Sequence, residues 1–184
     1  GIESMSCIPM MGNTPRPNIK LFSDDKLIGL SHSMGITAET LVDKYKISKL
    51  EQDKFAYNSH KKALKAQKSK LFDKQIIDIL GVKKDEGPRL NTSIKKLSEL
   101  KPVFKNNGSV TAGNSSQVSD GAAVCILASA NFVKKYKLTP MARFCGYSVS
   151  GVDPKIMGVG PVGAINKVLQ RLNHKRNYKK KKEK

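Results

Sequence analysis

The sequence predicts a mixed α/β fold, and three stretches of the chain support this prediction. The first is a long helix over residues 48–69, because Ser48 and Glu51 form the capping-box pattern S-x-x-E. The second is the apolar run AAVCIL at 122–127, which is typical of a buried strand. The third is an amphipathic helix that Pro161 begins, with an apolar face made by Pro161, Ala164, Ile165, Val168, Leu169 and Leu172.

Three shorter helices are also expected. One begins near Thr37, which is expected to cap its first turn, with Glu39 close to the positive helix end. The second lies over 94–100 and ends before Pro102, and the third covers 129–136. On the long helix, small residues recur at helical spacing and permit close approach of another segment: Ala56, Ser59, Ala63 and Ala66. His60 beside this stripe is interpreted as a packing or surface histidine.

The remaining segments are expected to be strands and loops. Residues 1–9 end a strand, 10–30 pass over the surface, and further strands are predicted at 72–82 and 142–149. A turn is expected at 85–89 and a loop at 151–161. The tail at 173–184 is basic and of low complexity, so it is predicted to be disordered. This tail has two other interpretations. It is an electrostatic tether, or it consists of residues translated past the end of an exon or in a shifted reading frame.

The chain is strongly basic, with 34 Lys and Arg against 15 Asp and Glu and a net charge of +19. Such a charge suits an anionic partner, either nucleic acid, an acidic membrane or a phosphate-bearing ligand. The lysines are spread along the whole chain, so a lysine-rich codon usage is favoured over selected nucleic-acid binding. Aromatic residues are only 6%, Trp is absent and no nucleic-acid motif is present, so no nucleic-acid partner is expected. No apolar run approaches the length that spans a bilayer.

The cysteines predict no metal site. Cys7, Cys125 and Cys145 are widely spaced and form no CxxC or Cys/His pattern. Cys125 lies in the predicted 122–127 strand and is expected to be a small core residue. We expect all three thiols to be reduced, as in an intracellular protein.

A small, polar loop at 108–121 runs directly into the predicted 122–127 strand. Gly113, Asn114 and Gly121 tolerate positive φ, and Ser115, Ser116 and Ser119 supply short hydroxyls. Such a loop lets backbone amides approach a ligand closely. As a pattern alone it equally fits an ordinary loop before a strand.

Five stretches together resemble the thiolase family in the right order: ESMS at 3–6, MGITAE at 34–39, LKPVFKNNGSVTAGN at 100–114, TAGNSSQVSDGAA at 111–123 and GVDPKIMGVGP at 151–161. The resemblance is best to 3-ketoacyl-CoA thiolases of fatty-acid β-oxidation, with acetyl-CoA acetyltransferases next, and covers roughly residues 1–172. It implies a layered αβαβα thiolase fold that is incomplete here. The implied parts are 1–9 (end of the N-terminal half), 10–107 (the inserted substrate-loop domain), 108–138 (return to that half), 139–172 (start of the C-terminal half) and the 173–184 tail.

The resemblance also implies an activity, the cleavage of a 3-ketoacyl-CoA by free CoA into acetyl-CoA and a shortened acyl-CoA. A nucleophilic cysteine takes the acyl group, a second cysteine moves a proton, a histidine activates the nucleophile and oxyanion holes hold the developing charge. In the family these groups lie upstream of Gly1 or beyond the point where this sequence stops. Cys7, Cys125, Cys145, His32, His60 and His174 match none of them. We therefore expect no catalytic residue in this chain and no activity from it alone.

Four ligand-facing positions follow from the resemblance. Arg89 matches an arginine near the nucleotide end of CoA, where a guanidinium stacks on adenine or meets phosphate. Ser116 matches a serine that approaches the pantetheine arm, and Met34 and Met157 match methionines that line the acyl pocket. The alternative interpretations are a solvated charge for Arg89, a turn hydroxyl for Ser116 and core filling for the two methionines. Ser33 precedes Met34 where some thiolases have a CoA-contacting histidine, and His32 is offset by one, so that contact is not carried over.

Two further hypotheses stand beside the enzyme. One is a catalytically inactive thiolase-like protein that binds CoA or a partner, and the other is a basic nucleic-acid-binding module. CoA and acyl-CoA are the expected ligands, as substrates, with no covalently bound cofactor. Complete thiolases form dimers or tetramers and lie inside the cell, in peroxisomes or mitochondria. Because the chain holds only part of each half, apolar surface is expected to be exposed at 122–127 and on the final helix.

Overall fold

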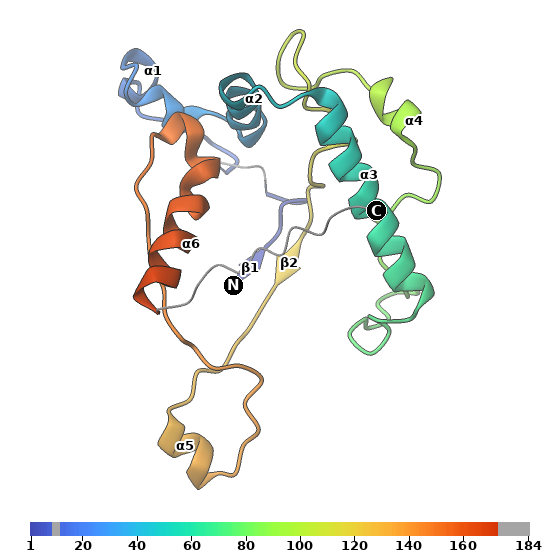
Figure 1. Cartoon of the computed structure of the whole chain (residues 1–184), viewed down its shortest axis with the longest axis vertical. Coiled ribbons are helices and arrows are strands. Elements are labelled where there is room, and N and C mark those ends of the chain that lie inside the picture. Colours follow the sequence, from blue (N-terminus) through green and yellow to red (C-terminus); the bar gives the residue numbers. More distant parts are fainter. Residues whose placement is uncertain (9–11, 173–184) are drawn as a thin grey trace. The chain divides into compact units, whose positions relative to one another are not determined.

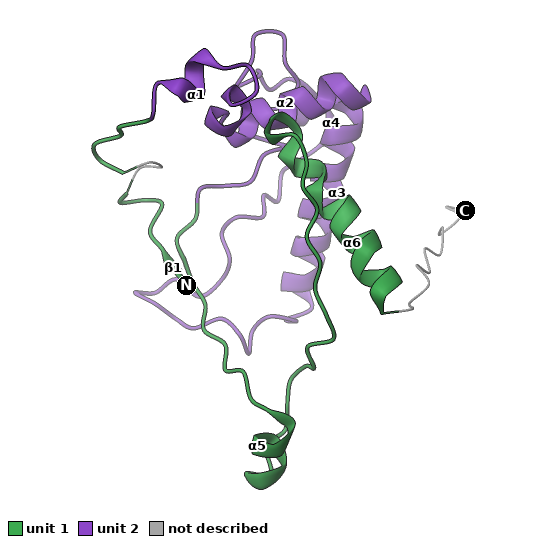
Figure 2. Ribbon diagram, turned by 90° about the vertical axis from the view of Figure 1, so that its left-hand side faces the viewer, with its two compact units in different colours: residues 1–17, 119–184 green, residues 18–118 purple. Residues whose placement is uncertain are grey.

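The computed structural model describes residues 1–8 and 12–172, which form two compact units. One unit comprises Gly1–Pro17 with Ser119–Lys184, and the other comprises Asn18–Val118 (Figure 2). The predicted basic tail at 173–184, with His174, lies outside the described residues. The boundaries expected from the family resemblance, including the 10–107 loop domain, stay a prediction.

The Asn18–Val118 unit is helical. It contains α1 (Lys20–Ser23), the 3₁₀ helix η1 (Ile28–Ser31), α2 (Met34–Tyr45), α3 (Lys49–Lys68) and α4 (Ile94–Ser98). Helix α4 packs beside α3, far from it in sequence (Figure 1). The buried interior of this unit is small and mostly polar: apolar Leu97 and Val110 are buried together with Thr37, Glu39, Asp53 and Thr111. Hydrogen bonding therefore contributes much of what holds this unit together.

Helix α3 forms where its capping box predicts it. The Ser48 backbone N–H donates to Glu51 Oε2 at 2.9 Å, and Glu51 N–H donates to Ser48 Oγ at 3.2 Å. These two bonds satisfy donors that a bare helix end leaves unpaired. Hydrogen bonds from the Ser48 hydroxyl and then from its backbone N–H hold the pKa of Glu51 below its ordinary value of 4.5. The helix ends at Lys68, so the prediction over 48–69 is confirmed.

Helix α2 begins earlier than predicted. Ser33 is its N-cap, with Oγ accepting from the Ile36 N–H, and Met34 is already helical. Thr37, the expected cap, lies inside the helix and is 4% exposed. The expectation at Thr37 was wrong because Ser33 offers an equivalent hydroxyl one turn earlier. Helices α4 and α5 (Ala130–Lys135) agree with prediction, each capped by a serine, Ser93 and Ser129.

The other unit contains a two-stranded antiparallel sheet, in which β1 (Ile2–Glu3) pairs with β2 (Gly121–Ala122). It also holds α5, the 3₁₀ helix η2 (Pro154–Val159) and α6 (Gly160–Arg171). Helix α6 confirms the final helix predicted from Pro161. The predicted loop at 151–161 is partly wrong, because its second half forms η2.

The structure does not contain the three longer strands predicted at 72–82, 122–127 and 142–149. Of the predicted 122–127 strand, Ala122 lies in β2 and pairs with Ile2, and 142–149 contains no strand. Strands are stabilised by hydrogen bonds to a neighbour, and among the described residues this pairing ends at Ala123, which exchanges two backbone hydrogen bonds of 2.8 Å with Gly1. Residues 72–82 contain turns and one isolated bridge between Ile79 and Val82, where the Gly81 N–H donates to Asp78 Oδ1 at 3.0 Å and Leu80 adopts φ 51°.

Apolar surface is exposed where it was expected. Val124 is 92% and Leu127 88% exposed, and on α6 Ile165 is 44% exposed. Cys125 is exposed, so its expected place in a core is wrong, because the described residues place no strand beside the segment that carries it. Cys7 and Cys145 are also exposed, and all three thiols are free. Among the helices in the described ranges, none combines the length and apolar character needed to cross a bilayer.

Candidate functional site

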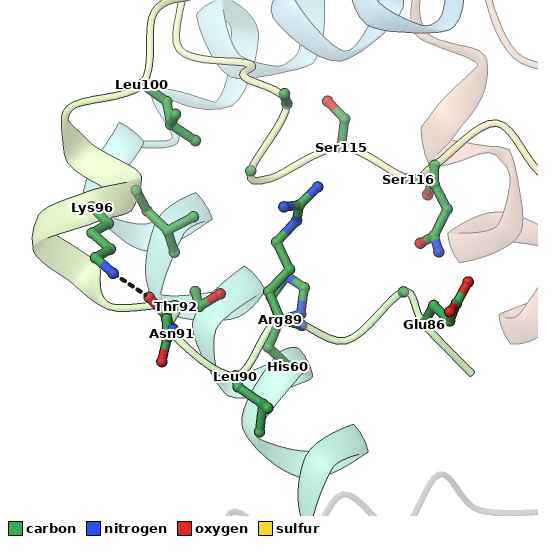
Figure 3. Close-up of a pocket in the computed structure, with 15 residues that line it drawn as sticks. His60, Glu86, Arg89, Leu90, Asn91, Thr92, Lys96, Leu100, Ser115 and Ser116 are labelled. Carbon is green, nitrogen blue, oxygen red and sulfur yellow. Dashed lines mark hydrogen bonds between the residues drawn. The ribbon is translucent and has the colours of Figure 1, made fainter. Parts of the chain in front are cut away.

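A hollow of about 910 Å³ opens in the Asn18–Val118 unit. Its lining comes from α3, the 86–92 loop, α4 and the 112–117 segment (Figure 3). Both charged and apolar side chains take part: His60, Glu86, Arg89, Leu90, Lys96, Leu97 and Leu100. The 112–117 segment adds two serine hydroxyls, Ser115 and Ser116. A concave site in which leucine side chains lie beside polar and charged groups can hold a ligand that has both apolar and charged parts.

The arginine side of the hollow is anchored to α3. The Arg89 N–H donates to His60 Nδ1 at 3.2 Å, so His60 fixes the loop rather than standing free. This agrees with its interpretation as a packing histidine. The loop turns because Gly87 N–H donates to Asp85 Oδ1 at 2.8 Å. In Figure 3 the Arg89 side chain extends from its loop toward the segment that carries Ser115.

A second cation lies on the α4 side of the hollow. Lys96 Nζ donates to the backbone oxygen of Asn91 at 2.9 Å (Figure 3). The lining contains two cations, Arg89 and Lys96, and one carboxylate, that of Glu86. The hollow therefore carries a surplus of positive charge, which suits a phosphate-bearing ligand.

The 112–117 segment forms one wall of the hollow, and the residues that lead into this wall are held by a carboxylate from α2. Glu39, 2% exposed, accepts at Oε1 from the backbone N–H groups of Ser109 and Val110, at 2.9 and 2.7 Å. Bonds from backbone N–H to a buried carboxylate are among the stronger hydrogen bonds in proteins. A Cβ on Gly108 would contact the Glu39 carboxylate, so glycine is required for this close approach.

A second buried carboxylate holds the same wall from α3. Asp53, 1% exposed, pairs with Lys49 Nζ at 2.6 Å and accepts from Asn114 Nδ2 at 3.2 Å. Lys49 Nζ also donates to the Leu97 carbonyl at 2.8 Å, which ties α3 to α4. The network therefore connects two helices and the serine-bearing wall of the hollow.

Gly113 is needed for space rather than for backbone freedom. Positive φ among the described glycines occurs at Gly12 and Gly81 only, so the positive φ considered for Gly113 and Gly121 is not used. Asn114 likewise has no positive φ. A Cβ on Gly113 would lie 2.5 Å from side-chain atoms of Leu97 and Leu100. The glycine lets the wall lie directly against these two leucine side chains.

The structure brings together two of the four predicted ligand-facing residues. Arg89 and Ser116 line the same hollow. Met34 is 54% exposed and does not line it, and Met157, 50% exposed, belongs to the other unit. Within the described ranges, no group of three or more His, Cys, Asp or Glu side chains is placed to hold a metal ion.

Sequence reasoning missed the residues that support the hollow. Glu39 was interpreted only as a helix-end charge, and Asp53 and Lys49 were not considered. A signal for Asp53 was present, because it lies three positions before Ala56 and so extends the stripe of small residues on the packed face of α3. A carboxylate on such a face requires a buried partner.

A separate polar contact joins the two chain segments that make up the sheet-bearing unit. Asp120 accepts from the Ser6 hydroxyl at 2.6 Å and from the Ser6 backbone N–H at 2.9 Å. These bonds, the hydroxyl first, hold the pKa of Asp120 below its ordinary value of 3.8. The contact links the segment after β1 to the residue that precedes β2.

Comparison with known proteins identifies the family. Residues 1–131 match the model of the thiolase N-terminal domain. A probable acetyl-CoA acyltransferase of Staphylococcus aureus is 43% identical over 93% of this chain and 48% of its own length. The chain spans about half the length of the curated relatives it matches.

Solved structures agree with the sequence comparison. The dimeric peroxisomal thiolase of Saccharomyces cerevisiae matches with a TM-score of 0.83 and 37% identity, over 95% of this chain and 47% of that one. Human mitochondrial 3-ketoacyl-CoA thiolase in complex with CoA matches with a TM-score of 0.77 and 42% identity, over 95% and 48%. The chain belongs to the thiolase family and carries an incomplete thiolase fold.

Proposed function

We propose that the chain is part of a thiolase-type acyltransferase and that its hollow binds coenzyme A and acyl-CoA as substrates. The observation that supports this most directly is that Arg89 and Ser116 line one hollow of about 910 Å³. Arg89 meets the nucleotide end of CoA, and Ser116 lies along the pantetheine arm. Both roles come from the thiolase resemblance, and their common hollow gives one ligand access to both.

The reaction we propose for the complete enzyme is thiolytic cleavage of a 3-ketoacyl-CoA to acetyl-CoA and a shortened acyl-CoA, as in fatty-acid β-oxidation. The names of the similar proteins support it, since they include an acetyl-CoA acyltransferase and a 3-ketoacyl-CoA thiolase. We further propose that Met34 and Met157 belong to the acyl pocket, that the enzyme acts inside the cell, in a peroxisome or mitochondrion, and that it assembles as a dimer or tetramer.

The chain by itself is proposed to bind without catalysing. Cys7, Cys125 and Cys145 are exposed and match no family nucleophile. Incubating the protein with acetoacetyl-CoA and CoA is therefore expected to yield no acetyl-CoA. Formation of acetyl-CoA at a rate above that of a heat-inactivated sample would refute this part of the proposal.

Calorimetric titration with CoA tests the binding proposal. Wild-type protein is expected to bind CoA, and Arg89→Ala is expected to weaken binding by about tenfold, the loss of one charged contact. Arg143→Ala is the matched control, because Arg143 is an exposed arginine of the other unit and its loss changes net charge equally. Absence of CoA binding by the wild type, or equal weakening by both variants, would overturn the assignment of the hollow.

A further inference from the structure

Both polar atoms of the Asn114 side chain are hydrogen-bonded, and one of these bonds connects the wall of the hollow to α3. Its Nδ2 donates to Asp53 Oδ1 at 3.2 Å and to the Ser109 carbonyl at 3.0 Å. Its Oδ1 accepts from the Thr111 N–H at 2.8 Å. A single carboxamide therefore joins the backbone at Ser109 and Thr111 to the buried Asp53 of α3.

The residues around this carboxamide are rigidly placed. Thr111 is fully buried and Asp53 is 1% exposed. The Thr111 hydroxyl oxygen accepts from the Gly113 N–H at 3.2 Å, and the Ser115 hydroxyl donates to the Thr111 carbonyl at 2.7 Å. Buried polar groups with all partners present give a segment one defined conformation.

The segment continues directly into the hollow. Ala112, Gly113, Ser115 and Ser116 line it, whereas Asn114 points away from it into the network with Asp53. Ser116 follows Asn114 by two residues, so hydrogen bonds made on the far side of the wall hold the backbone that leads to Ser116. The Arg89 side has a separate anchor, since its loop is held by His60.

We propose that Asn114 is a positioning residue, and that its hydrogen bond to Asp53 sets the affinity of the hollow for the pantetheine arm of CoA. This inference rests on the proposed function, because it assumes that CoA occupies the hollow. It assigns Asn114 no contact with the ligand. When the wall leaves its position, Ser116 moves away from the arm, while the arginine side is unchanged.

The decisive variant is Asn114→Asp, which keeps the acceptor for the Thr111 N–H but replaces the group that donates to Asp53 and to the Ser109 carbonyl by a second carboxylate oxygen. Two ligands are titrated into each protein, CoA and adenosine 3′,5′-bisphosphate, which lacks the pantetheine arm. If the wall keeps its position in only about one Asn114→Asp molecule in ten, the affinity of this variant for CoA falls by about tenfold. The affinity for the bisphosphate is expected to stay within about twofold of the wild type.

Two further variants separate positioning from general damage. Asn58→Asp introduces the same chemical change on the exposed surface of α3 and is expected to leave both affinities unchanged. In the double variant Asp53→Asn with Asn114→Asp, the amide at 53 donates to the carboxylate at 114, which restores the contact with its direction reversed. CoA affinity is expected to recover in part, an outcome that general unfolding does not give.

The outcomes distinguish this inference from the proposed function. If the wild type binds neither ligand, the proposed function fails and this inference fails with it. If the wild type binds CoA but Asn114→Asp binds it equally well, or loses both ligands to the same extent, only the positioning role is overturned. A double variant weaker than Asn114→Asp alone would also overturn it.

Discussion

Replacement of Glu39 tests whether the wall of the hollow depends on hydrogen bonds to one buried carboxylate. Glu39 on α2 accepts from two backbone N–H groups, those of Ser109 and Val110, at 2.9 and 2.7 Å. Glu39 is 2% and Val110 6% exposed, so water does not readily replace the lost acceptor. In Glu39→Ala both N–H groups lose their partner.

The expected cost follows from these contacts. A buried donor without a partner costs about 1–3 kcal/mol, toward the lower figure at half-buried Ser109, so Glu39→Ala is expected to lower the free energy of unfolding by about 3 kcal/mol. Glu39→Gln keeps an acceptor oxygen of the same reach but loses the charge. Since charged acceptors bind about twice as strongly as neutral ones, its cost is expected to be about 1 kcal/mol.

Urea denaturation monitored by circular dichroism measures the two values, with the midpoint and slope fitted for each variant. Glu99→Ala serves as the matched control, because Glu99 is an exposed carboxylate whose removal is expected to change stability by less than about 0.5 kcal/mol. Equal costs for Glu39→Gln and Glu39→Ala would refute the reasoning, because the loss of charge that both variants share would then account for the whole cost and the acceptor oxygen kept by Gln for none of it. A cost below that of Glu99→Ala would refute it too.

Two shorter predictions concern the helix cap and the sheet-bearing unit. Ser48→Ala removes the N-cap of α3 and is expected to cost about 1 kcal/mol, with faster hydrogen exchange at the first amides of that helix. Because Ser6 lowers the pKa of Asp120 below 3.8, their contact stabilises the fold above pH 3.8 and loses that effect as pH falls through the lowered pKa. Titration of the Asp120 carboxyl carbon by NMR is expected to show Ser6→Ala raising this pKa toward 3.8; an unchanged value would contradict the contact.

Local signals predicted the helices well. The capping box at Ser48 places the start of α3, and Pro161 places the start of α6 within a residue. Both signals act between residues a few positions apart, so no other part of the chain is needed to satisfy them. The start of α2 was misplaced because two hydroxyl residues, Ser33 and Thr37, offer the same local chemistry.

Apolar runs predicted strands that the described chain does not form. Residues 122–127 have the composition of a buried strand, yet Val124 and Leu127 are almost fully exposed. A strand depends on hydrogen bonds to residues distant in sequence, and composition does not name those partners. The same reason explains the exposed thiol of Cys125.

In the candidate site too, some residues were predicted from the sequence and others were found only in the structure. Resemblance to the family pointed to Arg89 and Ser116, and the structure places both in the lining of one hollow. Glu39, Asp53 and Asn114 were missed as supports, because each acts through a contact with a segment far away in the chain.

By itself, the sequence determined the family, the helix boundaries with local caps and the excess of positive charge. The tertiary structure alone decided that two carboxylates from different helices hold one wall of the hollow, and that Met34 lies outside it. The physical reason is that burial leaves a carboxylate in need of donors, and only the folded chain brings those donors within reach.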